Sequence, residues 1–460
     1  MDYQAALELL TPLGQGHLLQ YWEDLSSEQQ THLLAQIERL DVSLLAKQQQ
    51  LLLTLEHPPR VFEPFPNFDV SGNKQDIEKG KEMIAHGLVG CLIIAGGQAS
   101  RLHLDGPKGV CPITAIRHKS LFQLFAEKII AAGKQAKRHL PVAIMTSPLN
   151  HDATVAFFEK NHLFGLDPHQ LSFFSQAVLP LLDERGNLFL QTTDTIAEGP
   201  DGNGGALHQF YKNKLWQSWH KQGVQYLNFV LIDNPLADPF DAGLIGYHQR
   251  AGGEIVVKVT TKETPEESVG ILVKEKYHAA VVEYTELDDK ARTATNAEGS
   301  LKYSLANISL FSFTMDFIKN SAVDTNHPLP LHKAHKAVKY LNAEGMTVQA
   351  DKPMAWKFEK FIFDILPRAA KVSALVYPRE QSFAPLKQFS GDDSFEMVTA
   401  AIEANDRRIL ESVTGTPCTV TPLEISQDFY YPTEELLTTW HGRTVTQSGY
   451  IEAALKAVAR

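Results

Sequence analysis

The central feature of the sequence is residues 90–109, GCLIIAGGQASRLHLDGPKG. The apolar run at 91–95 is typical of a strand that is buried on both faces. The glycine pair at 96–97 follows directly, and glycines there let the backbone approach a phosphate and present its N–H groups. Arg101 and Lys108 then supply two cations suited to phosphate oxygens. A strand, a glycine loop and two cations together indicate phosphoryl or nucleotidyl chemistry.

The glycine pattern excludes two common nucleotide motifs. Taken alone, a Gly-Gly turn after a strand is an ordinary feature of α/β proteins. The loop contains neither the dinucleotide fingerprint G-x-G-x-x-G nor the P-loop pattern G-x-x-x-x-G-K-[S/T]. What remains is Gly-Gly-x-x-x-Arg-Leu followed by Pro-Lys-Gly. This arrangement resembles the activation loop of the sugar-nucleotide pyrophosphorylases, in particular the eukaryotic-type UDP-N-acetylglucosamine pyrophosphorylases.

The composition is that of an ordinary globular enzyme, with 460 residues, 43% hydrophobic and 21% charged. This length predicts two or three domains. The net charge of −11 argues against broad nucleic-acid binding. No apolar run reaches about 18 residues, so we expect no membrane partner. The three cysteines form no C-x-x-C pair and residues 1–4 lack signal-peptide features, so we expect a cytoplasmic protein. The sequence does not indicate the oligomeric state.

Three ranges differ in their pattern. Residues 1–80 have leucine stripes at helical spacing and predict a helical region. Residues 81–370 alternate apolar strands with helices, which predicts a catalytic domain with a doubly wound, mostly parallel, Rossmann-like sheet. The resemblance implies the nucleotide-diphospho-sugar transferase type of this fold. Residues 371–460 predict a small α+β domain. Ligands of such sheets bind beyond the carboxyl ends of the strands, so we expect the glycine pair at 96–97 and Asp233 to share one cleft.

A second glycine-rich stretch, AEGPDGNGG, covers residues 197–205. Its exposed N–H groups suit a base edge or sugar hydroxyls, and a helix predicted near Gly205 adds a positive end, although an isolated loop would be a plain turn. The stretch resembles the uridine- and sugar-binding loop of the family, which implies that Gly202 and Asn203 contact substrate. Gln176 can pair its amide with an imide edge, and its position matches the uracil-contacting glutamine of the family.

Asp233 follows the apolar strand predicted at 226–232. On its own it suits either the N-cap of a helix or a divalent metal bound to a triphosphate. In the family that the chain resembles, an aspartate at this place, followed by asparagine as here, holds Mg²⁺. The resemblance therefore implies a magnesium cofactor with Asp233 as its ligand.

Further site residues are identified only by the resemblance. Without it, each would be interpreted as an ordinary surface residue or as part of a helix core. Lys357 and Lys387 match the two phosphate-binding lysines of the family, and Phe361 and Phe363 match the wall of the sugar pocket. The resemblance implies catalytic roles for Arg101, Lys108, Lys357 and Lys387, and substrate binding by Ala95, Gly96, Gly97, Gln176, Gly202, Asn203, Asp233, Gly270, Glu283, Asn307, Phe361 and Phe363.

The function implied is a uridylyltransferase that makes UDP-N-acetylglucosamine and pyrophosphate from UTP and N-acetylglucosamine 1-phosphate. Glucose 1-phosphate or a broad range of sugar phosphates is the alternative within the class. Ala99 and His103 depart from the family pattern, which usually has glycine at both places, and Ala99 disfavours a positive φ. They motivate a second alternative, a catalytically weak sugar-nucleotide-binding protein. A nicotinamide-dependent dehydrogenase is disfavoured because the fingerprint is missing.

Overall fold

The computed structural model describes residues 1–53, 60–324 and 326–454 of the chain. The chain forms two compact units, each assembled from separate stretches of sequence. Unit 1 comprises Met1–Pro59, Gln176–Gly205 and Pro328–Ile362, and unit 2 comprises Arg60–Ser175, Ala206–His327 and Phe363–Arg460. These bounds differ from the three consecutive ranges expected from the sequence, and the independent folding of those ranges stays a prediction.

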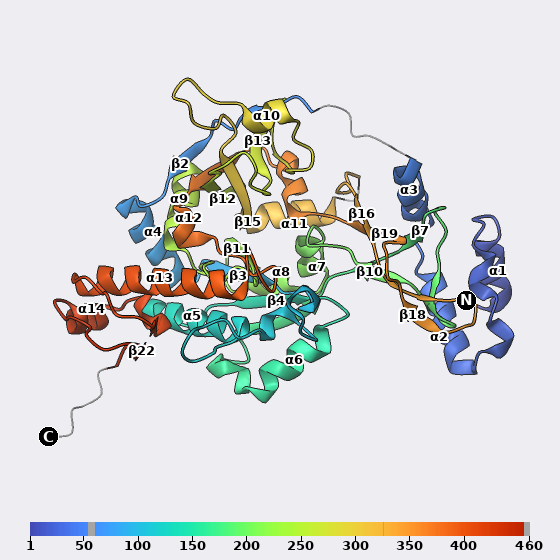
Figure 1. The fold of residues 1–460 in the computed structure, drawn as a ribbon, viewed down its shortest axis with the longest axis horizontal. Helices are drawn as coiled ribbons and strands as arrows, with labels where there is room; N and C mark the ends of the chain where they lie inside the picture. Colours follow the sequence, from blue (N-terminus) through green and yellow to red (C-terminus); the bar gives the residue numbers. More distant parts are fainter. Residues whose placement is uncertain (54–59, 325, 455–460) are drawn as a thin grey trace. The chain divides into compact units, whose positions relative to one another are not determined.

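The described part of unit 2 contains an eleven-stranded sheet (Figure 1). Its main path is β2 (Phe68–Val70), β20 (Val372–Val376), β12 (Ile255–Thr261), β15 (Leu305–Thr314), β11 (Tyr226–Leu231), β3 (Val89–Ile94), β4 (Val142–Thr146) and β5 (Leu171–Ser175). Off this path, β13 (Ile271–Glu275) pairs with β15 and also with β1 (Glu63–Pro64) and β14 (His278–Val282). Neighbours along the path are parallel except at β15, which is antiparallel to both β11 and β12. The predicted mostly parallel α/β fold is confirmed.

The register of the central strands fixes which edge carries the loops. β3 and β11 are parallel, and Ile94 pairs with Leu231 at their last positions. The loops that follow these two strands therefore leave the sheet at the same carboxyl edge. β15 is antiparallel to β11, so its first residues, from Leu305, lie at this edge too. The carboxyl edge thus gathers three segments that are far apart in the sequence.

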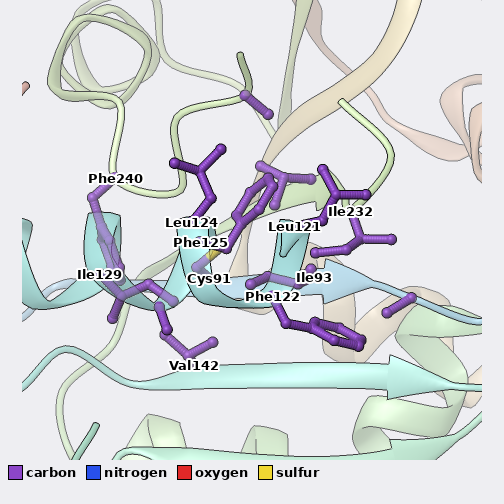
Figure 2. Close-up of a cluster of buried hydrophobic side chains, with 14 of the residues drawn as sticks. Cys91, Ile93, Leu121, Phe122, Leu124, Phe125, Ile129, Val142, Ile232 and Phe240 are labelled. Carbon is purple, nitrogen blue, oxygen red and sulfur yellow. The ribbon is translucent and has the colours of Figure 1, made fainter. Parts of the chain in front are cut away.

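Helix α5 (Leu121–Ala136) supplies much of the core of unit 2. Its N-cap, Ser120, accepts a hydrogen bond from the backbone of Gln123. Figure 2 shows apolar side chains of α5, among them Phe122 and Phe125, meeting side chains of β3 and β4. Because both phenylalanines are about 1% exposed, truncating either to alanine would cost about 3–5 kcal/mol. The strand that leads into the glycine loop is therefore firmly held.

Unit 1 combines three N-terminal helices with short strands. The helices are α1 (Tyr3–Leu10), α2 (Ser27–Glu38) and α3 (Val42–Leu53), so the predicted helices are present up to Leu53, whereas β1 and β2, also within 1–80, are strands of the unit 2 sheet. The strands used below are β6 (Val178–Pro180), β10 (Glu198–Pro200), β7 (Leu182–Asp183), β16 (His332–Lys336) and β19 (Ala355–Glu359). β19 pairs with β16 and β7, and β10 pairs with β6. Leu33, Ile37 and Phe358 share one buried cluster, so the helices and these strands have a common core.

The C-terminal part of unit 2 contains α13 (Phe395–Thr414), β21 (Leu423–Ile425), α14 (Glu434–Trp440) and β22 (Gly449–Ile451). Ser394 caps α13, and Gly415 ends it in the left-handed conformation, a common way to end a helix. Among the residues that the structure describes, no helix has the length and apolar character needed to cross a bilayer.

Candidate active site

The loop after β3 is held closed by hydrogen bonds at its base. The backbone N–H of Lys108 donates to the carbonyl oxygen of Gly97 at 3.0 Å. Asn150, which follows β4, donates its side-chain amide to the carbonyl oxygens of Ala95 (3.1 Å) and Gly97 (3.3 Å). Asn150 is 1% exposed, so this bridge is shielded from water. Asn150 therefore fixes the start of the glycine loop, a role that no local pattern in the sequence indicates.

The two unusual residues of this loop sit differently from expectation. Ala99 has φ −87° and ψ 13°, which an ordinary residue adopts without strain, and its side chain is fully buried. The expected conflict between Ala99 and a positive φ therefore does not arise. The left-handed position is instead His103, with φ 57° and ψ 32°. Histidine tolerates this region better than most side chains do, so the loop keeps its turn at this position.

Lys108 and Asp233 meet at the carboxyl edge of the sheet, where the strand ends placed the glycine pair at 96–97 beside Asp233. Lys108 Nζ lies 3.5 Å from Asp233 Oδ2 and donates to the carbonyl oxygen of Leu386 at 3.0 Å. The backbone N–H of Leu386 in turn donates to the carbonyl oxygen of Asp233 at 2.7 Å. These contacts join the glycine loop, the end of β11 and the segment that carries Lys387. Asp233 Oδ1 is buried and has no hydrogen-bond partner.

Asn234 anchors the same segment from the other side of Asp233. Its side-chain nitrogen donates to the carbonyl oxygen of Ser382 at 2.8 Å, and its side-chain oxygen accepts from the N–H of Ala384 at 3.1 Å. Asn234 is 1% exposed, so its amide is fully committed to these bonds. The Asp-Asn pair after β11 therefore has a divided role, since Asp233 faces Lys108 while Asn234 binds backbone.

Lys128 of α5 fixes the turn that follows Asp233. Its ammonium donates to the carbonyl oxygens of Pro235 (2.6 Å) and Ala237 (2.9 Å). Burial disfavours the charged form and lowers the pKa of Lys128 to about 8. Sequence reasoning missed this lysine because it lies within an apolar helix, more than a hundred residues before the turn.

The other two cations predicted in unit 2 are more exposed. Arg101 lies on the 3₁₀ turn Ser100–Leu102 and its side chain faces solvent. Lys387 follows Leu386 directly, and its Nζ lies 3.4 Å from Asp393 Oδ2. The backbone N–H of Lys387 also donates to the carbonyl oxygen of Asp393 at 2.9 Å. A phosphate at Lys387 must therefore compete with this carboxylate.

The three residues expected to contact the sugar come together at the start of β15. The backbone N–H of Asn307 donates to the carbonyl oxygen of Gly270 at 2.8 Å. A Cβ on Gly270 would lie 2.9 Å from Glu283 Oε1, so a larger residue here would displace the Glu283 side chain. The pairing of β12 with β15 shifts between Lys258 and Val259, and the extra residues of this bulge include Ser309 with φ 55°. Within the bulge, the side-chain oxygen of Asn307 accepts a hydrogen bond from the N–H of Ser309 at 3.2 Å.

The second glycine loop, in unit 1, lies tightly against the backbone after β19. The N–H of Gly204 donates to the carbonyl oxygen of Lys360 at 2.9 Å, and the side chain of Asn203 accepts from the N–H of Ile362 at 2.9 Å. Gly202 has φ +85°, and a Cβ there would lie 2.4 Å from the carbonyl oxygen of Lys360. Both the conformation and the spacing therefore require glycine at position 202.

Asp201 is a buried acid at the base of this loop. It is 2% exposed, its Oδ1 has no hydrogen-bond partner, and its Oδ2 lies 3.9 Å from Lys360 Nζ. Burial raises the pKa of Asp201 to about 6, against the opposing attraction of Lys360. The N–H of Asp201 donates to the carbonyl oxygen of Ala177 at 3.1 Å, which brings the buried Gln176 beside the loop.

The predicted residues near 360 divide between the units. Lys357 of β19 pairs with Glu359, with 2.8 Å between Nζ and Oε1. The ring of Phe361 lies 4.7 Å from that of His332, centroid to centroid, and both belong to unit 1. Phe363 is buried on the 3₁₀ helix Ile362–Arg368 and belongs to unit 2.

Each unit thus gathers its own part of the predicted site. In unit 2 the structure brings together two groups. The group at the glycine loop and β11 comprises Ala95, Gly97, Lys108, Asp233 and the segment of Lys387. The group at the start of β15 comprises Gly270, Glu283 and Asn307. In unit 1 it brings together Gln176, Gly202, Asn203 and the segment that begins with Lys357. Sequence reasoning missed the residues that hold these loops in place, which are Asn150, Lys128 and Asp201.

Comparison with known proteins extends the likeness over most of the chain. The family model described as UTP–glucose-1-phosphate uridylyltransferase matches residues 62–431. UDP-N-acetylglucosamine diphosphorylase 2 of Arabidopsis thaliana is 31% identical over 472 aligned residues, which cover 96% of this chain and 92% of the relative. UDP-N-acetylglucosamine pyrophosphorylase of Saccharomyces cerevisiae is 31% identical over 412 aligned residues, which cover 84% of this chain and 86% of the relative.

Solved structures agree with these relatives. The crystal structure of the uridine diphosphate N-acetylglucosamine pyrophosphorylase from Trypanosoma brucei in complex with an inhibitor has a TM-score of 0.79 at 26% identity, and the match covers 95% of each chain. A mutant UDP-glucose pyrophosphorylase from Leishmania major has a TM-score of 0.57 at 16% identity over 79% of this chain and 77% of the other, which is a likeness of fold. The similarity first seen in residues 90–109 therefore covers nearly the whole chain.

Proposed function

Because this chain belongs to the UTP–glucose-1-phosphate uridylyltransferase family, we propose that it makes UDP-N-acetylglucosamine and pyrophosphate from UTP and N-acetylglucosamine 1-phosphate. The observation that carries the reaction class is the meeting of Lys108 with Asp233 beside the glycine loop. A cation and a carboxylate at the carboxyl edge of such a sheet suit a nucleotide triphosphate and its metal. The choice of sugar is supported by the names of the relatives that align over most of their length.

The reaction needs orientation and charge neutralisation more than proton transfer. A phosphate oxygen of the sugar 1-phosphate attacks the α-phosphorus of UTP, and a new P–O bond forms there. The bond from this phosphorus to the bridging oxygen breaks, and pyrophosphate leaves with the electron pair. Because the attacking oxygen is already an anion, no general base is required. The enzyme must hold the two anions in line and stabilise the charge on the leaving group.

The two cations of the glycine loop take the second task in this proposal. Lys108 is held at the base of the glycine loop and Arg101 lies on the same loop, so both would neutralise charge on the leaving pyrophosphate. Lys387 and Lys357 would bind the sugar phosphate. Each is paired with a carboxylate on its own segment, Asp393 and Glu359 respectively, so the substrate phosphate would replace an acidic partner.

The surroundings of Asp233 suit a magnesium ion. Its buried Oδ1 lacks a hydrogen-bond partner, although a buried carboxylate oxygen normally has one. Within the described ranges, no cluster of three or more His, Cys, Asp or Glu side chains could hold a metal. A single carboxylate is what Mg²⁺ uses when substrate phosphates and water complete its shell. When bound, the ion would neutralise phosphate charge, and Asp233 would hold it.

Recognition of the base and the sugar is assigned to separate groups of residues. Gln176, Gly202 and Asn203 would contact the uracil, because their amides and backbone N–H groups suit an imide edge. Gly270, Glu283 and Asn307 would contact sugar hydroxyls at the start of β15, and Phe361 and Phe363 would wall the sugar pocket. We also propose a cytoplasmic location, which the free, buried state of all three cysteines favours.

The test is release of pyrophosphate from UTP and Mg²⁺ with N-acetylglucosamine 1-phosphate or glucose 1-phosphate. We expect a higher kcat/KM with the N-acetylated sugar. Equal values with the two sugars would refute the proposed sugar preference while leaving the reaction class in place. Binding of UDP-N-acetylglucosamine without turnover of any sugar phosphate would favour the alternative of a catalytically weak binding protein.

A further inference from the structure

His103 and Phe389 form an aromatic stack between two loops of unit 2. Their ring centroids lie 5.1 Å apart and the ring planes differ by 14°. Both side chains are exposed, with Phe389 at 56%. His103 lies on the glycine loop and Phe389 follows Lys387 on the segment after β20, so the contact joins positions almost three hundred residues apart. Neither ring has a role in the reaction described above.

The backbone at His103 favours a residue without a side chain, yet an imidazole is present. Its φ of 57° is a conformation in which glycine is relaxed and a Cβ is crowded. The ring is not buried, so no gain from core packing offsets this cost. The contact that the ring does make is the stack on Phe389, and offset or parallel stacking of rings at this separation is favourable.

The stack is the outer of two connections between the same segments. The inner one is the hydrogen bond from Lys108 Nζ to the carbonyl oxygen of Leu386. Behind it, the buried side chains of Leu102 and Leu386 belong to one apolar cluster. The loops are therefore joined at their bases by burial and a charged donor, and at their exposed ends by the two rings.

Each end of the stack lies two residues from a cation that the proposed reaction uses. Arg101 precedes His103 by two residues, and Lys387 precedes Phe389 by two. Arg101 is exposed, and Lys387 has 43% of its side chain exposed, so packing alone does not fix either cation. Whatever holds His103 against Phe389 also limits the separation of these two cations.

We propose that His103 and Phe389 act as a ring clasp, a pair of positioning residues that holds the Arg101 loop against the Lys387 segment. The clasp rests on the proposed uridylyltransferase function. Its effect is to set the two cations at a spacing that fits phosphate anions before substrate arrives. Opening the clasp would leave the chemistry of Lys108 intact. Arg101 and Lys387 would then lose more conformational entropy when they bind phosphate, which weakens binding.

The experiment is a double-mutant cycle on the full-length chain with Phe389→Ala, His103→Gly and the double variant. Each single variant should raise the KM for pyrophosphate, measured in the reverse direction with UDP-N-acetylglucosamine, by about 2- to 10-fold, as expected for loss of one ring pair. The kcat should change less than the KM. The double variant should be no worse than either single variant, because both remove the same contact.

Matched variants separate the clasp from a general loss of structure. Leu104→Ala truncates an exposed neighbour of His103 and should leave the KM at the wild-type value. Phe389→Tyr keeps a stacking ring and should restore the KM. Additive effects in the double variant, or a wild-type KM in Phe389→Ala, would overturn the clasp alone. Absence of any turnover in the wild-type chain would instead overturn the proposed function, and the clasp with it.

Discussion

Replacing Asp201 with asparagine should stabilise the chain, and should do so more at neutral pH than at pH 5. The carboxyl is 2% exposed, one of its oxygens has no hydrogen-bond partner, and its nearest cation, Lys360, lies 3.9 Å away. Burial therefore destabilises the charged carboxylate by more than the attraction of Lys360 stabilises it. Asparagine has nearly the same shape and stays neutral, so it avoids this penalty while occupying the same space.

The size of the effect follows from the shift in pKa. The pKa of Asp201 is raised from 3.8 to about 6, and a difference of this size corresponds to about 3 kcal/mol of folding free energy. Because the pKa is higher in the folded chain, the stabilisation of the folded state by the neutral acid is fully present below pH 3.8 and is lost as the pH rises through about 6. The advantage of asparagine should therefore grow between pH 5.0 and 7.5 by about 1–2 kcal/mol.

The assay is equilibrium unfolding in urea at both pH values, followed by tryptophan fluorescence, for the wild type and the variant. Hydrogen exchange of peptides that cover 199–205 would localise the change to the loop. Asp351→Asn is the control, because Asp351 belongs to the same unit and is exposed. The free energy of unfolding of this variant should differ from that of the wild type by less than about 0.5 kcal/mol. An Asp201→Asn variant whose advantage is the same at both pH values would refute the reasoning about burial.

Three further predictions test the proposed chemistry. Lys108→Ala should lower kcat by about 100- to 1,000-fold with a smaller change in UTP affinity, since its charge is needed most as pyrophosphate leaves; equal losses in both quantities would contradict this role. Gly202→Ala places a Cβ 2.4 Å from a carbonyl oxygen. The variant should lose about 1–3 kcal/mol of unfolding free energy in urea and should bind uridine nucleotides more weakly by calorimetry. Wild-type values in both measurements would show that the loop backbone shifts to accommodate the Cβ. Removing Mg²⁺ with EDTA should abolish turnover, and Asp233→Asn should raise the Mg²⁺ concentration needed to restore it by at least about 10-fold.

The sequence predicted those site residues whose place depends on strand ends. The apolar run at 91–95 and the run before Asp233 identify two buried strands, and parallel pairing brings their carboxyl ends together. The glycine pair at 96–97 was therefore expected beside Asp233, and Lys108, whose backbone N–H is bonded to Gly97, lies 3.5 Å from that carboxylate. The family assignment also followed from local motifs, and the comparisons confirm it over most of the chain.

What could not be predicted depends on contacts between distant side chains and backbone. Asn150 holds the glycine loop, and Lys128 holds the turn after Asp233, but each bonds carbonyl groups that leave no pattern in the sequence. Ala99 was expected to conflict with a positive φ, because a family pattern gives the residue type at a position and not its φ. The structure places that turn at His103 instead.

The assembly of unit 1 from three stretches has a consequence for how the chain is made on the ribosome. Its first stretch ends at Pro59, but its last does not end until Ile362. At about 5–20 residues per second, roughly 15 to 60 seconds separate the emergence of these two positions during synthesis. Through that interval the N-terminal leucines lack Phe358, with which they share a buried cluster. A ribosome that stalls before codon 358 would therefore leave the N-terminal helices without the Phe358 part of their core.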